Sequence, residues 1–527
     1  MGDAAATARR AWFHRALALL AGAGAALAQP PFGLLPGLFG YGLMFWLVDR
    51  PASPQPLRSA FLRGWLAGCA YFLISLWWLA EPFYVDAEAQ GWMAPFAVVI
   101  VAAGMALFWG AASWAYRALA GRGARRVLLF AAALAASEWL RGHILTGFPW
   151  DLPGESWKAG SAVSQAAALV GAYGLTWLTL AAFATPAVAL EGKRGRIAAA
   201  GGVALVAGLF AFGSARLAGA PASAPGAPWI RLVQANVKQE TKYDRALFAS
   251  IVERYLSLSA RPSAHPPAII VWPEGAIPDA LESYLAPGTW TRDAILGLLH
   301  PGQTLLVGGY HYGADRGARQ TAYNSLAALR RTDGNLRLLG LYDKFRLVPF
   351  GEFMPLDGLA SRLGIKQFVH VGDGFSPGHR PRPLRLPGLP AVQPLICYES
   401  LFPGFTREGA AASGVRAAWI VNVSNDSWFG TGSGPLQHLN IASYRAIEEG
   451  LPMARATPTG ISAVVDAFGR VVPGARLGEG VAGVIDAPLP PALEPTLFSR
   501  LGDLPFFAML LVSLLGARRP WPRSSRG

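Results

Sequence analysis

The sequence predicts a multi-pass α-helical membrane domain of about eight transmembrane helices, together with an α/β sandwich domain outside the cytoplasm. Three observations predict this architecture. Of the 527 residues, 53% are hydrophobic and only 15% are charged, whereas soluble proteins carry about 25% charged residues. The apolar residues gather in long runs near both ends of the chain, and residues 227–488 hold only short runs. The basic residues lie mainly between the long runs.

The apolar runs define the membrane domain, because a bilayer-spanning helix needs about 20 mostly apolar residues. Candidate spans lie at residues 12–28, 31–48, 60–80, 92–116, 127–145, 162–191, 197–216 and 496–516. We therefore expect an N-terminal membrane domain over residues 1–216, a last span over 496–516 and a basic tail over 517–527. The first run, preceded by Arg9 and Arg10, also fits a secretory signal peptide. The second run follows almost at once, which favours a helical hairpin.

The net charge of +14 reflects membrane topology, because short cytoplasmic loops collect Lys and Arg. The basic residues follow the second, fourth and sixth spans and fill the C-terminal tail: Arg50, Arg58, Arg63, Arg117, Arg122, Arg125, Arg126, Lys193, Arg194, Arg196, Arg518, Arg519, Arg523 and Arg526. The alternate loops are poor in basic residues. Both termini are thus expected in the cytoplasm, with residues 227–488 outside it, in a periplasm-like space. The charge then provides no indication of nucleic-acid binding.

Few charged residues lie inside the predicted spans. Glu138 and Arg141 are three residues apart at the end of the fifth span, so they share a helix face and can form an ion pair. The alternative is a catalytic role, since ionisable residues in membranes are often functional. Cys69 lies within the third span, where a packing role is the simpler interpretation.

Residues 227–488 alternate between predicted strands and helices, which is typical of an α/β sandwich. We expect buried strands at residues 229–236, 268–272, 304–309, 392–396 and 418–422, and helices around 244–259 and 436–450. In such folds the active residues gather beyond the strand ends.

Three strand ends in this domain carry reactive side chains. Glu274 follows one buried strand between Pro273 and Gly275, and burial would raise its pKa and make it a usable general base. Lys344 lies in a mostly apolar stretch, where its charge can stabilise an oxyanion. Cys397 ends a strand at the start of a possible helix, a setting that lowers a thiol pKa. The alternatives are a surface turn, an ion pair with Asp343 or Glu352, and an inert core residue, respectively.

The order Trp272-Pro273-Glu274, Asp343-Lys344, Cys397-Tyr398-Glu399 resembles the nitrilase, or carbon–nitrogen hydrolase, superfamily. The predicted spans, the run Leu347-Val348-Pro349-Phe350-Gly351-Glu352 and the run Asn425-Asp426-Ser427-Trp428-Phe429-Gly430 sharpen this resemblance to one family, the bacterial apolipoprotein N-acyltransferases. The resemblance covers nearly the whole chain. It implies a nitrilase-like α-β-β-α sandwich for residues 227–488.

The resemblance also implies a reaction. Cys397 would attack the sn-1 ester of a phospholipid, typically phosphatidylethanolamine, with Glu274 as base and Lys344 as oxyanion partner. The resulting thioester would acylate the N-terminal amine of a diacylated apolipoprotein. Supporting roles would fall to Glu352, Tyr398 and Glu399, and no metal or soluble cofactor would be needed. Substrate-binding candidates are Trp428, Phe429 and Tyr243, the last standing where the family often has Trp; Trp428 and Phe429 fit a plain core equally well.

Apolar loops around Phe353-Met354-Pro355-Leu356 and residues 359–371 fit either lipid entry or ordinary loop packing. Two other functions fit the sequence less well than the transferase. A membrane-anchored amidase or nitrilase-type hydrolase would share the triad and use water as acceptor, but eight spans exceed what an anchor needs. A transporter with an accessory domain conflicts with the scarcity of intramembrane charge. Expected partners are the phospholipid donor, the apolipoprotein acceptor and the bilayer, and nothing in the sequence indicates an oligomer.

Overall fold

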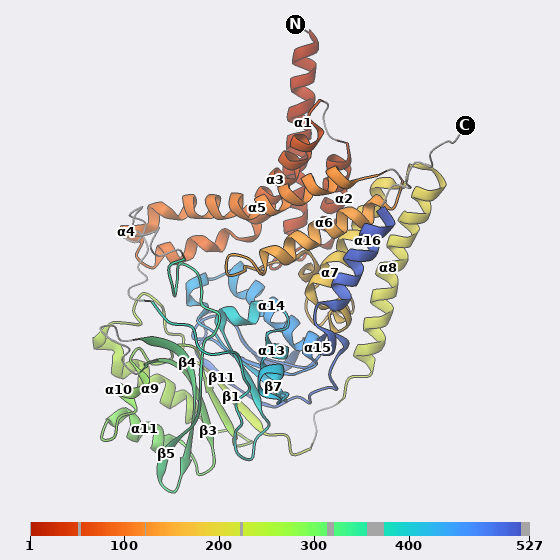
Figure 1. The fold of residues 1–527 in the computed structure, drawn as a ribbon. Coiled ribbons are helices and arrows are strands. Elements are labelled where there is room, and N and C mark those ends of the chain that lie inside the picture. Colours follow the sequence, from red (N-terminus) through yellow and green to blue (C-terminus); the bar gives the residue numbers. More distant parts are fainter. Residues whose placement is uncertain are drawn as a thin grey trace. The chain divides into compact units, whose positions relative to one another are not determined.

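The structure is a computed structural model that describes residues 2–50, 54–121, 123–221, 225–313, 321–355 and 374–517. The loop at 359–371, Leu356, Arg122 and the basic residues of the tail from Arg518 onward lie outside the described residues. The chain divides into two compact units (Figure 1). The helical unit comprises Met1–Ala80, Ala94–Gly219 and Leu501–Gly527, and the sandwich unit comprises Glu81–Met93 and Ala220–Arg500.

The helical unit contains an α-helix in each of the eight predicted apolar runs. These helices are α1 (Gly2–Leu27), α2 (Phe39–Asp49), α3 (Pro56–Ser75), α5 (Ala94–Leu119), α6 (Arg126–Arg141), α7 (Ala167–Ala184), α8 (Gly192–Ala218) and α16 (Leu504–Ala517). Short helical turns flank them: η1 (Leu35–Leu38), η2 (Trp77–Tyr84), η4 (Pro153–Ser156), η5 (Val163–Ala166) and η6 (Thr185–Val188). The helical nature of this region is thus confirmed.

These helices do not establish eight complete membrane spans. Among the described residues, three helical stretches are long and apolar enough to cross a membrane, at Ala87–Leu119, Val163–Val188 and Gly192–Ala218. A fourth results if Pro56–Ser75 and Trp77–Tyr84, which meet at a 48° bend, count as one span. Some of the helices are short: in the second apolar run a 3₁₀ turn precedes α2, so that its α-helix has only 11 residues, and α6 and α16 have 16 and 14 residues. Counting apolar residues along a sequence ignores such breaks.

At one end of the helical unit, ion pairs link three loops that are predicted to lie on the cytoplasmic side. Arg126 contacts Asp49 at 3.0 Å and Glu191 at 2.6 Å, and Arg50 contacts Glu191 at 3.0 Å. These residues come from the connections that follow the second, fourth and sixth apolar runs. The three connections therefore lie at the same end of this helical bundle, as the alternating charge pattern requires.

The predicted ion pair between Glu138 and Arg141 is present and fully enclosed in α6. Trp109 donates from Nε1 to Glu138 at 2.7 Å. Arg141 donates to the main-chain carbonyls of Phe148 and Trp150. Because the pair's partners are internal to the bundle, a structural role accounts for it. Cys69 is half-buried in α3.

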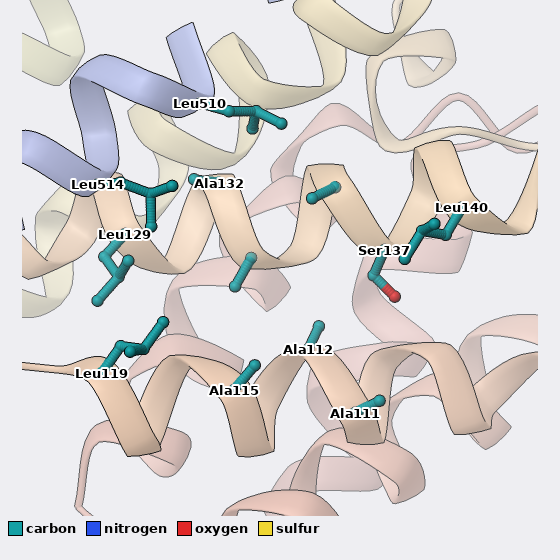
Figure 2. Close-up of a pocket in the computed structure, with 12 residues that line it drawn as sticks. Ala111, Ala112, Ala115, Leu119, Leu129, Ala132, Ser137, Leu140, Leu510 and Leu514 are labelled. Atoms are coloured by element: carbon teal, nitrogen blue, oxygen red, sulfur yellow. The ribbon is translucent and has the colours of Figure 1, made fainter. Parts of the chain in front are cut away.

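An apolar groove of about 300 Å³ lies between α5, α6 and α16 (Figure 2). Alanines from α5 and α6 form its floor, and leucines such as Leu119, Leu510 and Leu514 border it. Ser137 is the polar residue among those that line it. Such a surface suits the apolar interior of a bilayer, where small residues let helices approach closely.

The sandwich unit is built from two mixed sheets. The first has the strand order β11-β1-β2-β3-β4-β5 and the second β10-β9-β8-β7-β6. Its strands are β1 (Trp229–Gln234), β2 (Ile269–Trp272), β3 (Thr304–Tyr312), β4 (Ala322–Thr332), β5 (Asn335–Asp343), β6 (Val392–Ile396), β7 (Trp419–Val423), β8 (Met453–Ala456), β9 (Ser462–Val465), β10 (Val471–Leu477) and β11 (Gly483–Pro488). In each sheet three adjacent strands are parallel: β1, β2 and β3 in the first, and β6, β7 and β8 in the second.

Alternating side chains of these strands fill two cores. Ile269 and Val271 of β2 point into the core between the sheets, and Ile270 and Trp272 point to the opposite face, as the two-residue period of a strand requires. That outer face is covered by α9 (Phe248–Ser259), α10 (Leu281–Tyr284) and α11 (Trp290–Leu298), and the second sheet by α13 (Phe405–Ser413) and α14 (Ser433–Glu449) (Figure 1). The predicted α-β-β-α sandwich is therefore present.

The remaining short elements of the sandwich unit are α4 (Ala87–Gln90), η3 (Gly91–Met93), η7 (Arg245–Leu247), η9 (Cys397–Leu401), η10 (Asp426–Phe429) and α15 (Leu497–Leu501), the last of which reaches the boundary of the helical unit. All five predicted strands are present as β1, β2, β3, β6 and β7, and both predicted helices as α9 and α14. The strands from β8 to β11, and the hairpin of β4 and β5, were not predicted.

Candidate active site

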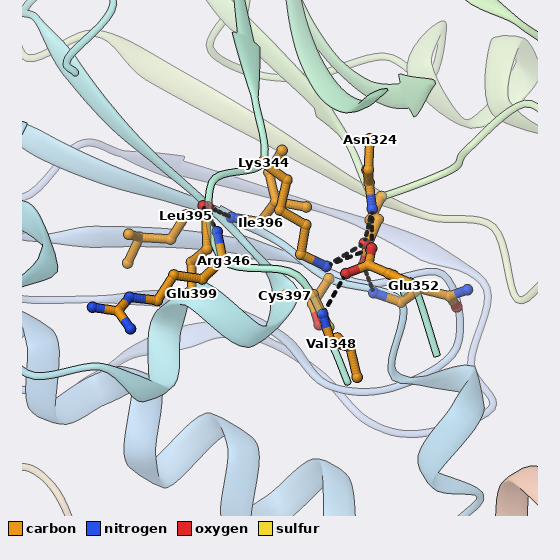
Figure 3. Close-up of polar contacts among 12 residues, drawn as sticks. Asn324, Lys344, Arg346, Val348, Glu352, Leu395, Ile396, Cys397 and Glu399 are labelled. Carbon is orange, nitrogen blue, oxygen red and sulfur yellow. Dashed lines mark hydrogen bonds and ion pairs between the residues drawn. The ribbon is translucent and has the colours of Figure 1, made fainter. Parts of the chain in front are cut away.

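The three predicted reactive residues meet where strands of both sheets end. Glu274 follows β2, Lys344 follows β5 and Cys397 follows β6. The Lys344 ammonium donates to Glu274 Oε1 at 3.3 Å and to Glu352 Oε1 at 2.8 Å (Figure 3). Cys397 lies close enough for its thiol and the Lys344 charge to influence each other electrostatically. A nucleophile, two carboxylates and a cation thus share one buried site.

Cys397 occupies a strained backbone conformation at a sharp turn. Its φ of 49° lies in the left-handed region, which is uncommon for residues other than glycine. The turn projects the side chain out of the strand direction, between the end of β6 and the short helix η9. Strain of this kind gathers at functional sites.

The thiol pKa of Cys397 is raised, so the prediction of a lowered pKa is wrong. The expected helix is a five-residue 3₁₀ turn, Cys397–Leu401, too short to supply the dipole of a longer helix. Burial raises the pKa of the Cys397 thiol, and the neighbouring Glu274 carboxylate raises it further against the opposing charge of Lys344. The residue is therefore a protonated thiol at neutral pH, and it needs a base to become a nucleophile.

Glu274 is the candidate for that base, and its pKa is lowered rather than raised. Burial alone would raise the pKa of Glu274, but the charge of Lys344 and hydrogen bonds to the carboxylate outweigh it. Asn324 of β4 donates to Oε1 at 2.7 Å, and the Asn425 N–H donates to Oε2 at 2.7 Å. The prediction considered burial by itself and omitted these donors. Glu274 therefore stays ionised and able to accept a proton.

Lys344 is held as a buried cation between two carboxylates. It is 1% exposed, and burial alone would lower its pKa, but Glu274 and Glu352 raise the pKa of Lys344 above its ordinary value. Asn324 donates to Glu352 Oε1 at 2.7 Å, and the Val348 N–H donates to Oε2 at 2.8 Å. Of the two ion pairs considered for Lys344, the one with Glu352 forms, while Asp343 binds His311 and Ser325 instead. Asn324 itself was not predicted.

Glu399 ties the Lys344 loop to the Cys397 turn. Its Oε1 accepts from the Tyr342 hydroxyl at 2.8 Å and from the main-chain N–H groups of Phe345 at 2.7 Å and Arg346 at 3.2 Å. Its Oε2 accepts from the Ile396 N–H at 2.8 Å. Because these donors flank Lys344 and Cys397, Glu399 is a positioning residue for both. Figure 3 shows it behind the turn, away from the Lys344 ammonium.

Replacing Glu399 with Gln is expected to impair activity and folding together. The amide NH₂ would face a main-chain N–H on one side or the other, which leaves at least one buried donor unpaired at a cost of about 1–3 kcal/mol. We expect the rate of the reaction at this site to fall on the order of 100-fold, with a lower melting temperature. The matched control is Glu408→Gln on α13, which is exposed and should leave both unchanged. Unaltered activity in Glu399→Gln would contradict the positioning role.

A second buried network supports Cys397 from the far side. Ser400 donates to the Cys397 carbonyl at 2.8 Å and contacts His438 Nε2 at 2.9 Å. His438 Nδ1 lies 3.1 Å from Asp426 Oδ1, which also accepts from Ser424 at 2.7 Å. The Ser424 side chain is in hydrogen-bonding contact with the Cys397 thiol. Asp426 is therefore linked to the Cys397 main chain through His438 and Ser400, and to the Cys397 sulfur through Ser424.

Arg455 keeps the Asp426 carboxylate of this network ionised. Its guanidinium donates to Asp426 Oδ2 at 2.6 Å, and both side chains are fully buried. Burial alone would raise the pKa of Asp426, but the charges of Arg455 and His438 and the hydrogen bonds from His438 and Ser424 lower it below its ordinary value. Asp426 lies in the run Asn425–Gly430 that resembles the family, but the sequence alone indicates no role for it, and it does not predict Ser400, Ser424, His438 or Arg455. An isolated Ser or His in a sequence carries no signal of such a network.

The other predicted site residues lie in different settings. Tyr398 is buried, with its ring 5.2 Å from Phe402. Phe429 packs edge-on against His438 at 5.4 Å, and Trp428 beside it is 39% exposed. Tyr243 is 64% exposed. The supporting role of Tyr398 and the substrate-binding roles of Trp428, Phe429 and Tyr243 stay predictions.

The sandwich fold and the Glu–Lys–Cys site define an enzyme of the carbon–nitrogen hydrolase class, and the family model described as carbon-nitrogen hydrolase matches residues 230–494. A second model, described as the apolipoprotein N-acyltransferase N-terminal domain, matches residues 21–185. The chain belongs to the apolipoprotein N-acyltransferase family.

Relatives named apolipoprotein N-acyltransferase match over nearly their full lengths. One from Caulobacter vibrioides is 56% identical over 96% of this chain and 94% of its own. One from Bradyrhizobium diazoefficiens is 39% identical over 96% of this chain and 95% of its own. One from Rhodopseudomonas palustris is 38% identical over 97% and 96%. The resemblance inferred from the motifs is thereby confirmed.

Proposed function

We propose that the chain transfers an acyl chain from the sn-1 ester of a phospholipid, typically phosphatidylethanolamine, to the N-terminal α-amine of diacylglyceryl-cysteine in apolipoproteins. Membership of the family supports the acceptor and the transfer. The observation that carries the chemistry is the Lys344 ammonium, which contacts Glu274 and Glu352 at 3.3 and 2.8 Å beside the Cys397 thiol. This arrangement places a base, a cation and a nucleophile within one buried site.

In the first step the Cys397 sulfur attacks the ester carbonyl while Glu274 accepts the thiol proton. The carbonyl oxygen becomes an oxyanion that Lys344 stabilises, since a buried, preorganised cation is worth more than one in water. Collapse of the intermediate breaks the ester C–O bond. The leaving lysophospholipid oxygen takes the proton from Glu274, and a thioester on Cys397 remains.

In the second step the neutral α-amine of the acceptor attacks the thioester. Glu274 accepts a proton from the amine nitrogen as the C–N bond forms, and Lys344 again faces the oxyanion. The C–S bond breaks, and the proton passes from Glu274 to the Cys397 sulfur. The products are an amide-linked lipoprotein and the free enzyme, so one base serves both halves of a ping-pong cycle.

Both substrates are lipids, so the proposal includes the membrane arrangement. We assign eight spans to residues 1–216 and 496–516, a periplasmic catalytic domain to residues 227–488 and a cytoplasmic tail to residues 517–527, in the bacterial inner membrane. The clustering of Asp49, Arg126 and Glu191 at one end of the helical unit supports the assigned sidedness. Apolar grooves such as the one between α5, α6 and α16 suit a lipid environment. The monomer is the proposed working form.

The maximal acylation rate is expected to change little between about pH 8 and 9 and to fall toward acid pH. The raised thiol pKa of Cys397 keeps the sulfur protonated across this range, and the lowered pKa of Glu274 keeps the base ionised. Burial raises the pKa of Glu399 to about 7, so the rate should fall first as Glu399 takes up a proton and then, at lower pH, as Glu274 does. Single-turnover rates at saturating donor test this. A tenfold rise per pH unit toward pH 9 would instead indicate attack by a freely titrating thiolate.

The function itself is tested with purified protein, a phospholipid and intact-mass measurement. We expect an acyl adduct that hydroxylamine removes, as a thioester requires. Addition of a diacylglyceryl-cysteine peptide should then yield amide-linked peptide and free enzyme. Release of fatty acid alone would identify a hydrolase, and absence of any adduct in folded protein would refute the acyl-enzyme.

A further inference from the structure

Lys242 is a buried cation that has no carboxylate in direct contact among the described residues. It follows β1, on the loop that leads to η7, and its side chain is 3% exposed. Among the residues that the structure describes, none forms a hydrogen bond or an ion pair with its ammonium. The nearby Tyr243 ring has its centroid 5.7 Å from Nζ. Burying an unpaired ammonium is costly, so its retention needs an explanation.

The ammonium lies directly against the turn that carries the catalytic base. A Cβ placed on Gly275, the residue after Glu274, would come within 2.6 Å of Lys242 Nζ. Gly275 has a φ of 56° and no side chain, which leaves this space to the lysine. Burial lowers the pKa of Lys242 to about 8, with the Glu274 charge opposing the change. At neutral pH the group is still mostly protonated.

Neither carboxylate of the site, Glu274 or Glu352, forms a hydrogen bond with the Lys242 ammonium. Both oxygens of Glu274 already have donors: Lys344 and Asn324 on Oε1, and the Asn425 N–H on Oε2. Glu352 likewise accepts hydrogen bonds from Lys344, Asn324 and the Val348 N–H. A free ammonium beside an already satisfied site is available to a ligand that brings its own negative charge.

We propose that Lys242 binds the phosphate of the phospholipid donor and so forms a head-group subsite next to Glu274. This inference rests on the proposed function, in which the donor contributes a phosphodiester. The phosphate of a glycerophospholipid is separated from its sn-1 ester carbonyl by only a few bonds, so both groups fit one site. The acceptor reacts through an amine that is cationic when protonated, which Lys242 disfavours. The subsite therefore selects the donor in the first half-reaction.

The test compares two acyl donors in Lys242→Met, which keeps the length of the side chain and removes its charge. With phospholipid, the donor concentration for half-maximal acylation should rise about tenfold or more, because a charge-assisted contact is lost. The maximal rate should stay within a few-fold. With a diacylglycerol, which has the ester and lacks the phosphate, Lys242→Met should match the wild type.

The control is Lys238→Met, on the same loop but exposed, which should behave as wild type with both donors. Equal losses with both donors in Lys242→Met would show that the lysine acts on the catalytic carboxylates, and would overturn the subsite. Unchanged kinetics with phospholipid would overturn it as well. Failure of the wild-type protein to form an acyl adduct with either donor would instead refute the proposed function. Circular dichroism and melting temperature confirm that each variant is folded.

Discussion

Replacement of Cys397 by serine is expected to abolish formation of the acyl-enzyme, with a loss on the order of 10³-fold or more in transfer. A serine hydroxyl has a much higher pKa than a thiol, and Glu274, whose pKa is lowered, is too weak a base to activate it. The readout is intact mass after incubation with phospholipid, followed by transfer to a diacylglyceryl-cysteine peptide.

The chain supplies its own control for this experiment. The second cysteine, Cys69, lies half-buried in α3 of the helical unit. Cys69→Ala should retain the adduct and the transfer activity. The double variant Cys69→Ala, Cys397→Ser should show no hydroxylamine-sensitive adduct. An adduct that persists in Cys397→Ser and disappears in Cys69→Ala would overturn the assignment of the nucleophile.

The sequence located the candidates Glu274 and Cys397 because each one follows a buried strand. Strands with an apolar run and a polar end, such as Ile269–Trp272 before Glu274 and Val392–Ile396 before Cys397, leave a readable pattern. These two strands belong to different sheets, so the meeting of their ends follows from the packing of the sheets and not from the sequence. Lys344 follows β5, a partly exposed strand that was not predicted. The hairpin of β4 and β5 was missed because residues 322–343 mix apolar and basic side chains without a clear alternation. Asn324, which lies within that hairpin, was missed with it.

The pKa values could not be predicted from single segments. The carboxylate of Glu274 depends on Lys344, which is 70 residues away, and on the Asn425 N–H, which is 151 residues away. Burial can be guessed from neighbouring residues, but these donors are visible only in the folded chain. The same reason explains why Lys242 went unnoticed: its loop reads as polar and exposed, and its burial against Gly275 results from the packing of β1 beside β2.

In the membrane domain, prediction from the sequence failed for a different reason. Composition correctly predicted helices in all eight apolar runs, but it did not predict their interruptions. Gly171 departs from helical geometry inside α7, with a φ of 68°. The chain bends by 48° between α3 and η2. Local breaks depend on packing against neighbouring helices, which hydropathy does not record.

Lys344→Met is expected to reduce acylation on the order of 10³-fold, through two separate effects. The oxyanion loses its cation, which alone costs about 10²–10³ in rate. In addition, Glu274 and Glu352 would share Asn324 without a positive charge between them. Two close carboxylates cannot both stay ionised in a buried site, so one of them takes up a proton. The pKa of Glu274 should then rise, and the acid limb of the pH–rate profile should move toward neutral pH.

A double variant separates these effects. In Lys344→Met, Glu352→Gln the repulsion between the carboxylates is removed together with the cation, so the melting temperature should recover toward the wild-type value, and the acid limb should move back. Acylation should stay low, because the oxyanion still lacks its partner. Lys344→Arg should not rescue, since a planar guanidinium does not fit a site in which the lysine is 1% exposed. Recovery of acylation in the double variant would show that Lys344 only balances the two carboxylates and does not face the oxyanion.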